Sequence, residues 1–557
     1  MKQIDIIKKY VNVFIKNLDK RHFRLHVILC CVVFLFVILH IKLFTIFHFN
    51  KTKKIIKDLD DNSSINRLDI IDRNGILLAR KVVAYDFYVY PYKLIDIEEN
   101  LDKIVDIFPN LDNRRDRLLE TMKTKAMDGK GAVLVKQNIF ATDKQKILNS
   151  GILGVEFQET QRRIYPHNNV ASHILGFLSV DGNGMMGIER YFDSYLKNTQ
   201  NKSIQLSIDI NIQNVVRHIV VDAVKKSNAK SGIALIVNIK TGELISAVSV
   251  PDFNPNNLKD ASSDNLFNRF SLGVYELGSV FKIFTATLAL DSGISSAKVY
   301  DTHTPFVLGD FIIHNFAGDL VRPNMDMVGI MQHSSNIGIA RIIEEIGNFN
   351  KQKELFQRLG LLDKIDIELP EIGRPMYQNR WSKTQAITRG YGHGIAVSPM
   401  NFIYAFSSII NHGQLVKPTI IKVDNNMEGL PVNIVSEKTS KKVRDLLRNV
   451  VKEGTGRQSA SEKYDVGGKT GTAIKTASKK DKCIKGLSYS RFKNLVSFVA
   501  AVPMKDPEYA YYILLDEPHT DSANVLRISG GRLVAPAMSE LITITGPMLN
   551  IAIEDSH

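Results

Sequence analysis

Residues 275–282 read YELGSVFK, and an apolar run continues from them to Leu290. This pattern predicts a buried helix that begins at Ser279, just after Gly278. Residues three apart share one face of a helix, so Ser279 and Lys282 would face the same way. The serine hydroxyl would lie at the positive end of the helix dipole, and a desolvated lysine would have a lowered pKa and could accept the hydroxyl proton. The stretch therefore predicts a serine nucleophile with a lysine base.

A serine and a lysine at this spacing do not identify a nucleophile by themselves, because the same spacing also arises by chance. Other sequence motifs are needed to decide which of these serine–lysine pairs is catalytic. The other copies are expected at exposed positions or on helix faces without a catalytic role: Ser194/Lys197, Ser227/Lys230, Ser295/Lys298 and Ser490/Lys493.

Two more polar elements follow along the chain. Ser334-Ser335-Asn336 offers a hydroxyl that can relay a proton and an amide that can hold a substrate amide. Lys469-Thr470-Gly471-Thr472-Ala473 follows two glycines, as expected for a strand that runs close past a ligand, and its lysine and threonines can bind a carboxylate. Each element has a second copy: Ser263-Asp264-Asn265 is expected to be a polar turn, and Lys240-Thr241-Gly242 a tight turn between two strands.

The order of the elements decides between these copies. SxxK, then SxN, then KTG is the signature set of penicillin-binding proteins and class A β-lactamases, and only Ser279, Ser334 and Lys469 occur in that order with wide spacings. The surrounding sequence resembles class B penicillin-binding proteins, and in particular their division-specific (FtsI-type) branch. The segments that carry the resemblance are RLDIIDRNGILLA (67–79), RIYPHNNVASHILGFLSVDGNGMMGIERYFD (163–193), YELGSVFK (275–282), GYGHGIAVSPMNFIYAFSSIINHG (390–413), GTGRQSASEKYDVGGKTGTA (454–473), LLDEP (514–518) and SGGRLVAPAM (529–538).

The resemblance implies a role for each matched residue. Ser279 would attack the penultimate D-Ala carbonyl of a stem peptide, and Lys282 would accept its proton. Ser334 and Lys469 would return a proton to the departing D-Ala, and the backbone N–H groups of Ser279 and Thr472 would form the oxyanion hole. No metal or cofactor is implied. The donor peptide and its carboxylate would be bound by Asn336, Thr470, Gly471 and Thr472.

Two positions depart from the family pattern: Leu277 stands in place of the usual proline, and Leu68 in place of a glycine. Neither change removes a catalytic group. The glutamate-bearing loop with which class A β-lactamases deacylate is not evident, so β-lactams are expected to acylate Ser279 and stay attached. Residues 60–200 leave no room for a transglycosylase domain, which argues against class A penicillin-binding proteins.

The function that the resemblance implies is cross-linking of septal peptidoglycan by a serine-type D,D-transpeptidase. A D,D-carboxypeptidase or β-lactamase-type hydrolase remains an alternative, as does a non-catalytic β-lactam sensor or divisome scaffold. The expected partners are peptidoglycan stem peptides, β-lactam antibiotics, the membrane, a septal glycosyltransferase and other divisome proteins.

An apolar stretch near the N-terminus predicts a membrane anchor. Residues 25–41 read LHVILCCVVFLFVILHI, and residues 44–49 extend the stretch to a length that can cross the hydrocarbon core as a helix. Residues 1–24 carry seven lysines and arginines, which favours a cytoplasmic N-terminus and a periplasmic catalytic domain. A cleaved signal peptide is the alternative, but no small-residue cleavage pattern follows the apolar run.

The remaining sequence predicts an α+β protein of two folded regions. Residues 60–200 alternate short apolar stretches with turns, including a hairpin at Asn74-Gly75, and predict an elongated, strand-rich pedestal of the dimerisation-domain type. The resemblance implies that residues 205–557 form the catalytic domain, an antiparallel sheet flanked by helices as in serine β-lactamases. Within that domain, residues 212–224 predict a helix, and the runs IALIVNI and ELISAVSV predict two strands.

The composition is consistent with a folded protein of more than one domain. The chain has 557 residues, enough for about two to four domains, and its 44% hydrophobic and 23% charged residues are typical of globular proteins. Its net charge of +14 favours an anionic partner, but no nucleic-acid-binding signature accompanies the charge, so nucleic acid is not expected. The three cysteines have neither a disulfide framework nor a metal-binding spacing.

Overall fold

The computed structural model describes residues 29, 32–39, 42, 67–198, 200–309, 311–316, 322–423, 431–476, 489–519 and 528–554. The chain divides into two units, Met1–Ile65 and Asn66–His557. Among the described residues, no helix combines the length and the apolar character that crossing a membrane requires. The predicted transmembrane segment, residues 25–49, lies mostly outside the described residues, and the predicted cytoplasmic segment, residues 1–24, lies wholly outside them.

A five-stranded antiparallel sheet in the order β16-β17-β18-β6-β7 is the centre of the larger unit. The predicted strand pair is confirmed as β6 and β7, and β6 also pairs along its whole length with β18, a strand near the other end of the chain. β16, which carries the KTG motif, is an edge strand. The strands are β6 (Ser231–Asn238), β7 (Leu244–Val250), β16 (Gly467–Thr476), β17 (Tyr489–Val502) and β18 (Tyr509–Asp516).

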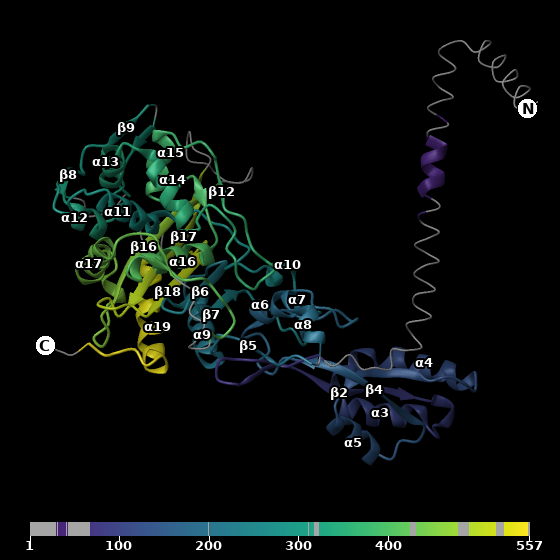
Figure 1. Ribbon diagram of the computed structural model, residues 1–557. Coiled ribbons are helices and arrows are strands. Elements are labelled where there is room, and N and C mark those ends of the chain that lie inside the picture. The colour runs from purple at the N-terminus through teal and green to yellow at the C-terminus, as the bar shows by residue number, and fades with distance from the viewer. Residues whose placement is uncertain are drawn as a thin grey trace, which may run out of the picture. The chain divides into compact units, whose positions relative to one another are not determined.

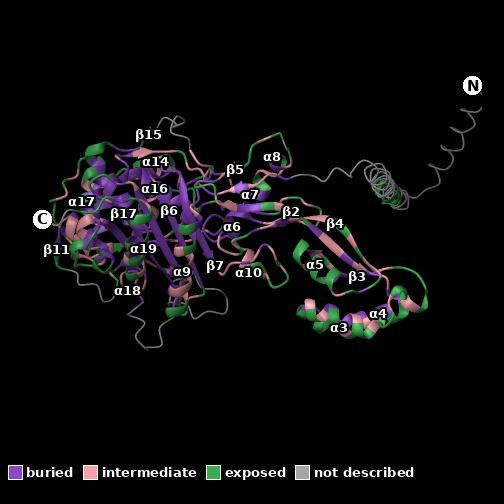
Figure 2. Ribbon diagram, turned by 90° about the horizontal axis from the view of Figure 1, so that it is seen from below, coloured by how far each residue is buried: buried purple, intermediate pink, exposed green. Residues whose placement is uncertain are grey.

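Helices cover both faces of this sheet (Figure 1). Alternate residues of a strand point to opposite faces, so Ala234 and Ile236 of β6 join one core with α9 (Ile210–Lys226) and α19 (Ala535–Met548). The residues between them join a second core with α11 (Lys282–Asp291) and α16 (Pro399–Ile410). Figure 2 shows the strands buried between these layers. The predicted α+β class, with an antiparallel sheet flanked by helices, is confirmed.

Several helices of this region begin where the sequence supplies a serine whose hydroxyl accepts a hydrogen bond from a backbone N–H of the first turn. The predicted helix at residues 212–224 is confirmed as α9, which begins after the capping carboxylate of Asp209. The other elements are α10 (Ser263–Leu266), η3 (Gly278–Phe281), β8 (Tyr300–Asp301), β9 (Phe306–Leu308), β10 (Phe311–Ile313), β11 (Asn324–Met325), α12 (Met327–Gln332), α13 (Asn336–Ile346), α14 (Phe349–Arg358), β12 (Met376–Tyr377), α15 (Lys383–Gly390), β13 (Ile395–Ala396), β14 (Gln414–Leu415), β15 (Val432–Asn433), α17 (Glu437–Glu453), η4 (Arg457–Ser459) and α18 (Gly530–Leu533).

The region that precedes the five-stranded sheet mixes strands with helices. Its predicted hairpin is confirmed: β1 and β2 pair antiparallel, and Gly75 in the turn has a φ of +85°. The region contains long strands as predicted, but the prediction missed three helices, α3, α4 and α5, of which α4 and α5 have little helical periodicity in the sequence. The elements are β1 (Ile70–Ile71), β2 (Leu77–Val89), η1 (Pro91–Lys93), α3 (Ile97–Ile107), η2 (Pro109–Arg114), α4 (Arg115–Met127), β3 (Val133–Ile139), α5 (Ala141–Asn149), β4 (Val155–Ile164), α6 (Ser172–Leu175), α7 (Gly187–Tyr191), α8 (Asp193–Lys197) and β5 (Ile204–Gln205).

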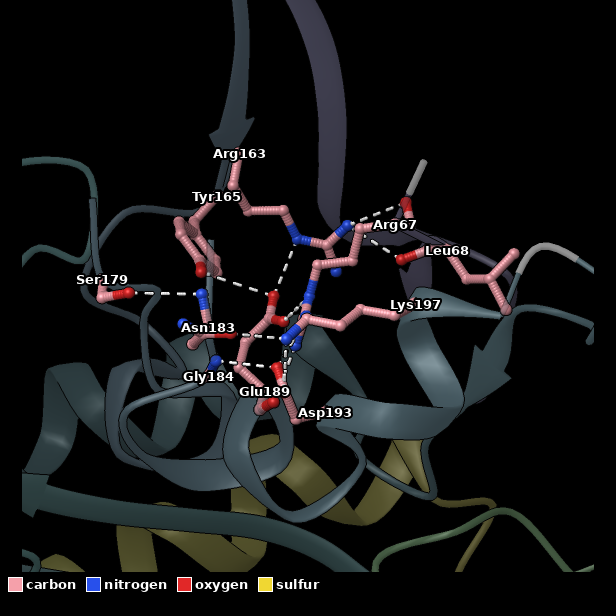
Figure 3. A network of polar contacts seen from close by, with 10 residues as sticks. All are labelled: Arg67, Leu68, Arg163, Tyr165, Ser179, Asn183, Gly184, Glu189, Asp193 and Lys197. Atoms are coloured by element: carbon pink, nitrogen blue, oxygen red, sulfur yellow. Dashed lines mark hydrogen bonds and ion pairs between the residues drawn. The ribbon is translucent and has the colours of Figure 1, made fainter. Parts of the chain in front are cut away.

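A buried ionic network joins these strands to the helices that follow them (Figure 3). The Glu189 carboxylate on α7 has no exposed side-chain surface and accepts hydrogen bonds from Arg67 Nε at 2.6 Å and Arg163 Nε at 2.7 Å. Arg67 also bonds to Asp193 on α8 at 2.8 Å. Both guanidinium groups are almost fully buried, and Glu189 is the carboxylate that they share, with Asp193 as a second partner of Arg67.

Candidate active site

Ser279 lies in a tight turn immediately before helix α11. The structure places it in the 3-10 turn η3, and the α-helix proper, α11, begins at Lys282 rather than at the serine. In a 3-10 turn, residues three apart are eclipsed, so Ser279 and Lys282 still lie above one another. Phe281 anchors the turn, because its ring is fully buried against Phe284 at a centroid distance of 5.1 Å.

Glycine at position 278 lets this turn approach the KTG strand. Gly278 has a φ of +62°, and a Cβ atom there would lie 2.4 Å from the Thr472 carbonyl oxygen. On the other side, Gly278 N–H donates to the Gly392 carbonyl at 3.2 Å, and a Cβ on Gly392 would lie 2.1 Å from the Gly278 oxygen. The serine turn is therefore held between β16 and the GYGHG segment, with no room for a side chain at either contact.

Ser334 occupies the turn between α12 and α13. Its φ is +59°, a left-handed conformation that is uncommon for a residue other than glycine and that often marks a functional site. The next residue, Ser335, is the N-cap of α13, where its hydroxyl accepts from Gly338 N–H at 3.0 Å. The turn thus presents the Ser334 side chain while α13 carries Asn336 at its first position.

Two buried lysines meet at the Ser334 hydroxyl. Lys282 Nζ lies 3.1 Å and Lys469 Nζ lies 3.0 Å from Ser334 Oγ, and neither lysine side chain is exposed. Lys282 also donates to the Ser334 carbonyl oxygen, and Lys469 donates to the Thr470 carbonyl oxygen at 3.1 Å. The structure thereby brings one residue of each predicted motif within hydrogen-bond distance of a shared oxygen.

The KTG strand carries the remaining predicted residues along the edge of the sheet. Thr470 Oγ1 lies 3.0 Å from the hydroxyl of Thr455, and Thr472 Oγ1 accepts from Gly530 N–H at 3.4 Å. A Cβ on Gly471 would lie 3.0 Å from the carbonyl oxygen of Leu277, so the serine turn packs directly on this strand. Thr470, Gly471 and Thr472 do not bond to Ser334; they lie on β16, next to it.

The histidines near the site are held neutral. Burial lowers the pKa of His393 to about 4, against a raising effect of its bond with the Tyr391 backbone, and the charge of Lys282 lowers it further. Burial also lowers the pKa of His333, with a smaller contribution from Arg322. At neutral pH these imidazoles carry no charge, so neither histidine adds a positive charge to the site.

The second copies of the motifs lie elsewhere in the fold. Ser263 to Asn265 form part of the short helix α10 with a capping box, rather than the expected polar turn, because the side chains of Ser262 and Asn265 cap each other. Lys240 to Gly242 form the expected turn between β6 and β7. Ser227 is buried at the C-cap of α9 and donates to the Ala223 carbonyl at 2.6 Å, so of the two expected positions it has the one on a helix. Within the described residues, no group of three or more histidine, cysteine, aspartate or glutamate side chains could hold a metal ion.

Comparison with known families identifies the class of protein to which this fold and site belong. Residues 232–542, which include all three motifs, match the family model described as "Penicillin binding protein transpeptidase domain", and residues 63–228 match "Penicillin-binding Protein dimerisation domain". The chain belongs to the penicillin-binding protein transpeptidase family, and within it to the class B, FtsI-like proteins.

Individual relatives agree with this assignment. The chain is 32% identical to the probable peptidoglycan D,D-transpeptidase FtsI of Caulobacter vibrioides, over 87% of this chain and 82% of the relative. It is 27% identical to the stage V sporulation protein D of Bacillus subtilis, over 87% and 78%. Among solved structures, penicillin binding protein 3 from Mycobacterium tuberculosis, complexed with aztreonam, has the same fold, with a TM-score of 0.65 at 21% identity over 88% of this chain and 97% of that one.

Proposed function

We propose that this chain cross-links septal peptidoglycan as a serine-type D,D-transpeptidase during cell division. The observation that carries the proposal is the Ser334 hydroxyl, which two buried lysines from the other two motifs approach at 3.0 and 3.1 Å. Family membership and the FtsI-type relatives support the same reaction. Burying two amines costs free energy, so such a cluster favours a catalytic role over a purely structural one.

In the proposed reaction, Ser279 Oγ attacks the penultimate D-Ala carbonyl of a stem peptide while Lys282 takes the hydroxyl proton. The bond to the terminal D-Ala nitrogen then breaks, and Ser334 and Lys469 deliver a proton to that nitrogen, so D-Ala leaves as an amine. An amine of a neighbouring stem peptide then attacks the acyl-enzyme and forms the new amide bond, and its proton passes to Ser334 and Lys469. The ester bond to Ser279 Oγ breaks, and Lys282 returns its proton to that oxygen.

The remaining residues bind the donor peptide. The backbone N–H groups of Ser279 and Thr472 form the proposed oxyanion hole, in which one donor contributes about 3 kcal/mol to stabilising the transition state. The tight approach of Gly278 to the Thr472 carbonyl supports this pairing, because it keeps the two backbone segments in contact. Asn336 orients the donor peptide. The carboxylate of that peptide is bound by Lys469, Thr470, Gly471 and Thr472.

Covalent labelling tests this proposal. A fluorescent penicillin should label the wild-type chain irreversibly, and mass spectrometry of the modified peptide should place the adduct on Ser279. Ser279→Ala should abolish labelling, whereas Ser295→Ala, at an exposed SxxK copy, should label normally. Rapid penicillin turnover would instead indicate a hydrolase, and labelling of Ser279→Ala would show that a different serine is the nucleophile.

Incubation with a stem pentapeptide and an amine acceptor tests the second half-reaction. A cross-linked product would support the transpeptidase, and release of D-Ala with a tetrapeptide as the only product would indicate a D,D-carboxypeptidase. In cells, normal septation with Ser279→Ala as the sole copy would indicate a non-catalytic scaffold.

The proposed arrangement of the chain is a single-pass protein of the inner membrane. Residues 1–24 would be cytoplasmic, residues 25–49 would span the membrane, and residues 60–200 would form a pedestal for the periplasmic catalytic domain, residues 205–557. In support, residues 32–39 are helical and all apolar, yet every one of their side chains is between 47% and 68% exposed, which suits a lipid environment. The anchor and the basic segment before it are the proposed contacts for a septal glycosyltransferase and other divisome proteins.

A further inference from the structure

The turn that carries Ser334 depends on a residue outside the three motifs. A left-handed conformation at a serine persists only where the surroundings fix it. Part of that support comes from Asn315, in a stretch of chain that follows strand β10.

Asn315 uses its side-chain amide to tie the turn to the rest of the domain. Its Oδ1 accepts from Ser335 Oγ at 2.9 Å and from Ile337 N–H at 3.2 Å, and its Nδ2 donates to the Thr302 carbonyl at 2.9 Å. Ile337 N–H is one of the free donors at the start of α13, and Gly338 N–H, another, is satisfied by Ser335. The cap of α13 is therefore shared between a local serine and a distant asparagine.

The residue before Asn315 holds the other predicted group of this motif. The His314 carbonyl accepts from Asn336 Nδ2 at 3.1 Å. An asparagine side chain has two amide hydrogens and one acceptor oxygen, so Asn336 keeps one N–H and its Oδ1 for a peptide ligand. Two consecutive residues thus fix both the turn of Ser334 and the orientation of Asn336.

Apolar packing keeps this stretch in place. Phe306 on β9 and Ile313 on β10 are 5% and 8% exposed and share a core cluster with residues of α13, namely Ile337, Ala340 and Ile343. The β9–β10 hairpin is thereby fixed against the same helix that Asn315 caps. Asn315 follows Ile313 by two residues, so this packing sets where its amide lies.

We infer that Asn315 is a positioning residue for the acylation step, because it holds the turn that presents Ser334 to both lysines. The inference rests on the proposed function, and it assigns Asn315 no contact with substrate. Loss of its acceptor oxygen frees Ser335 Oγ and Ile337 N–H and lets the Ser334 turn relax. The expected effect is on the rate of acylation within the bound complex rather than on initial penicillin binding.

Two substitutions separate this role from general stability. Asn315→Leu removes every hydrogen bond of the side chain, whereas Asn315→Asp keeps the acceptor for Ser335 and Ile337 and adds a negative charge that is favourable at a helix N-terminus. Stopped-flow acylation with a fluorescent penicillin should show a fall of about tenfold in the first-order acylation rate constant for Asn315→Leu, with the dissociation constant of the initial complex changed less than twofold. Asn315→Asp should stay within about threefold of wild type.

Asn324→Leu is the matched control, because Asn324 is exposed on β11 and its side chain bonds to no described residue. It should acylate like wild type. Asn315→Leu with a wild-type acylation rate, or Asn315→Asp as slow as Asn315→Leu, would overturn the inference. If Asn315→Leu does not fold, Asn315→Ala takes its place in the comparison with Asn315→Asp. Failure of the wild-type protein to acylate at all would instead refute the proposed function.

Discussion

Gly278→Ala tests whether close contact between the serine turn and the KTG strand is needed for catalysis. Alanine would have to adopt a φ of +62°, at a cost of about 1–2 kcal/mol relative to glycine. Its Cβ would also lie 2.4 Å from the Thr472 oxygen, so the turn and the strand would have to separate by more than half an ångström. A displacement of about 1 Å at reacting groups can cost about 100-fold in rate, so we expect penicillin acylation to slow by about 10- to 100-fold.

A second glycine of the same domain provides the control. Gly293, just beyond the far end of α11, has a φ of +87°, but no heavy atom lies within 4 Å of where its Cβ would be. Gly293→Ala should therefore pay a similar conformational cost without disturbing the site. The assay is the second-order acylation rate constant, measured beside the free energy of unfolding in denaturant. Equal acylation rates for the two variants would refute the reasoning, since strain alone would then explain any loss.

Two further predictions concern stability. Glu189→Gln leaves the buried Arg163 guanidinium without a carboxylate and Arg67 with Asp193 alone, and it should lower the free energy of unfolding by roughly 3–5 kcal/mol in chemical denaturation. Arg80→Gln, which breaks an exposed pair, should change the free energy of unfolding little, and similar losses in both variants would contradict the assigned burial cost. Burial lowers the pKa of His173 from 6.5 to about 4, so between these pH values the unfolded state binds more protons than the folded state. The free energy of unfolding therefore falls as the pH drops through this window, by roughly 3 kcal/mol in total. Urea denaturation at pH 7 and pH 4.5 should show a smaller decrease for His173→Asn than for wild type, and an equal decrease would argue against a neutral buried His173.

Side-chain chemistry alone left several copies of each short pattern in the sequence. The motif order of penicillin-binding proteins selected Ser279, Ser334 and Lys469, and the structure brings Ser334 and Lys469 together with Lys282. The central hairpin and α9 were predictable from the residues themselves, since their apolar runs have the period of the element that they form.

Other features depend on contacts that no local pattern encodes. Nothing near Asn315 in the sequence indicates that its amide caps a helix about twenty residues later, and nothing near Gly278 indicates that Gly392 lies against it. The left-handed conformation of Ser334 could not be predicted either, because serine does not favour that conformation by itself. The helices α4 and α5 of the N-terminal region were missed because so few of their residues are buried that no helical period stands out, whereas α3 has a clear apolar face and could have been predicted.

The hydroxyl between the two lysines has a consequence for the direction of proton movement. A hydroxyl has one hydrogen and two lone pairs, so when Ser334 donates to one amine, that amine must be uncharged and the other must donate to the oxygen. These roles exchange when the hydroxyl gives its proton to the uncharged amine and takes a proton from the other amine. A proton can thus pass from one lysine to the other through a single oxygen, with no heavy atom leaving its place.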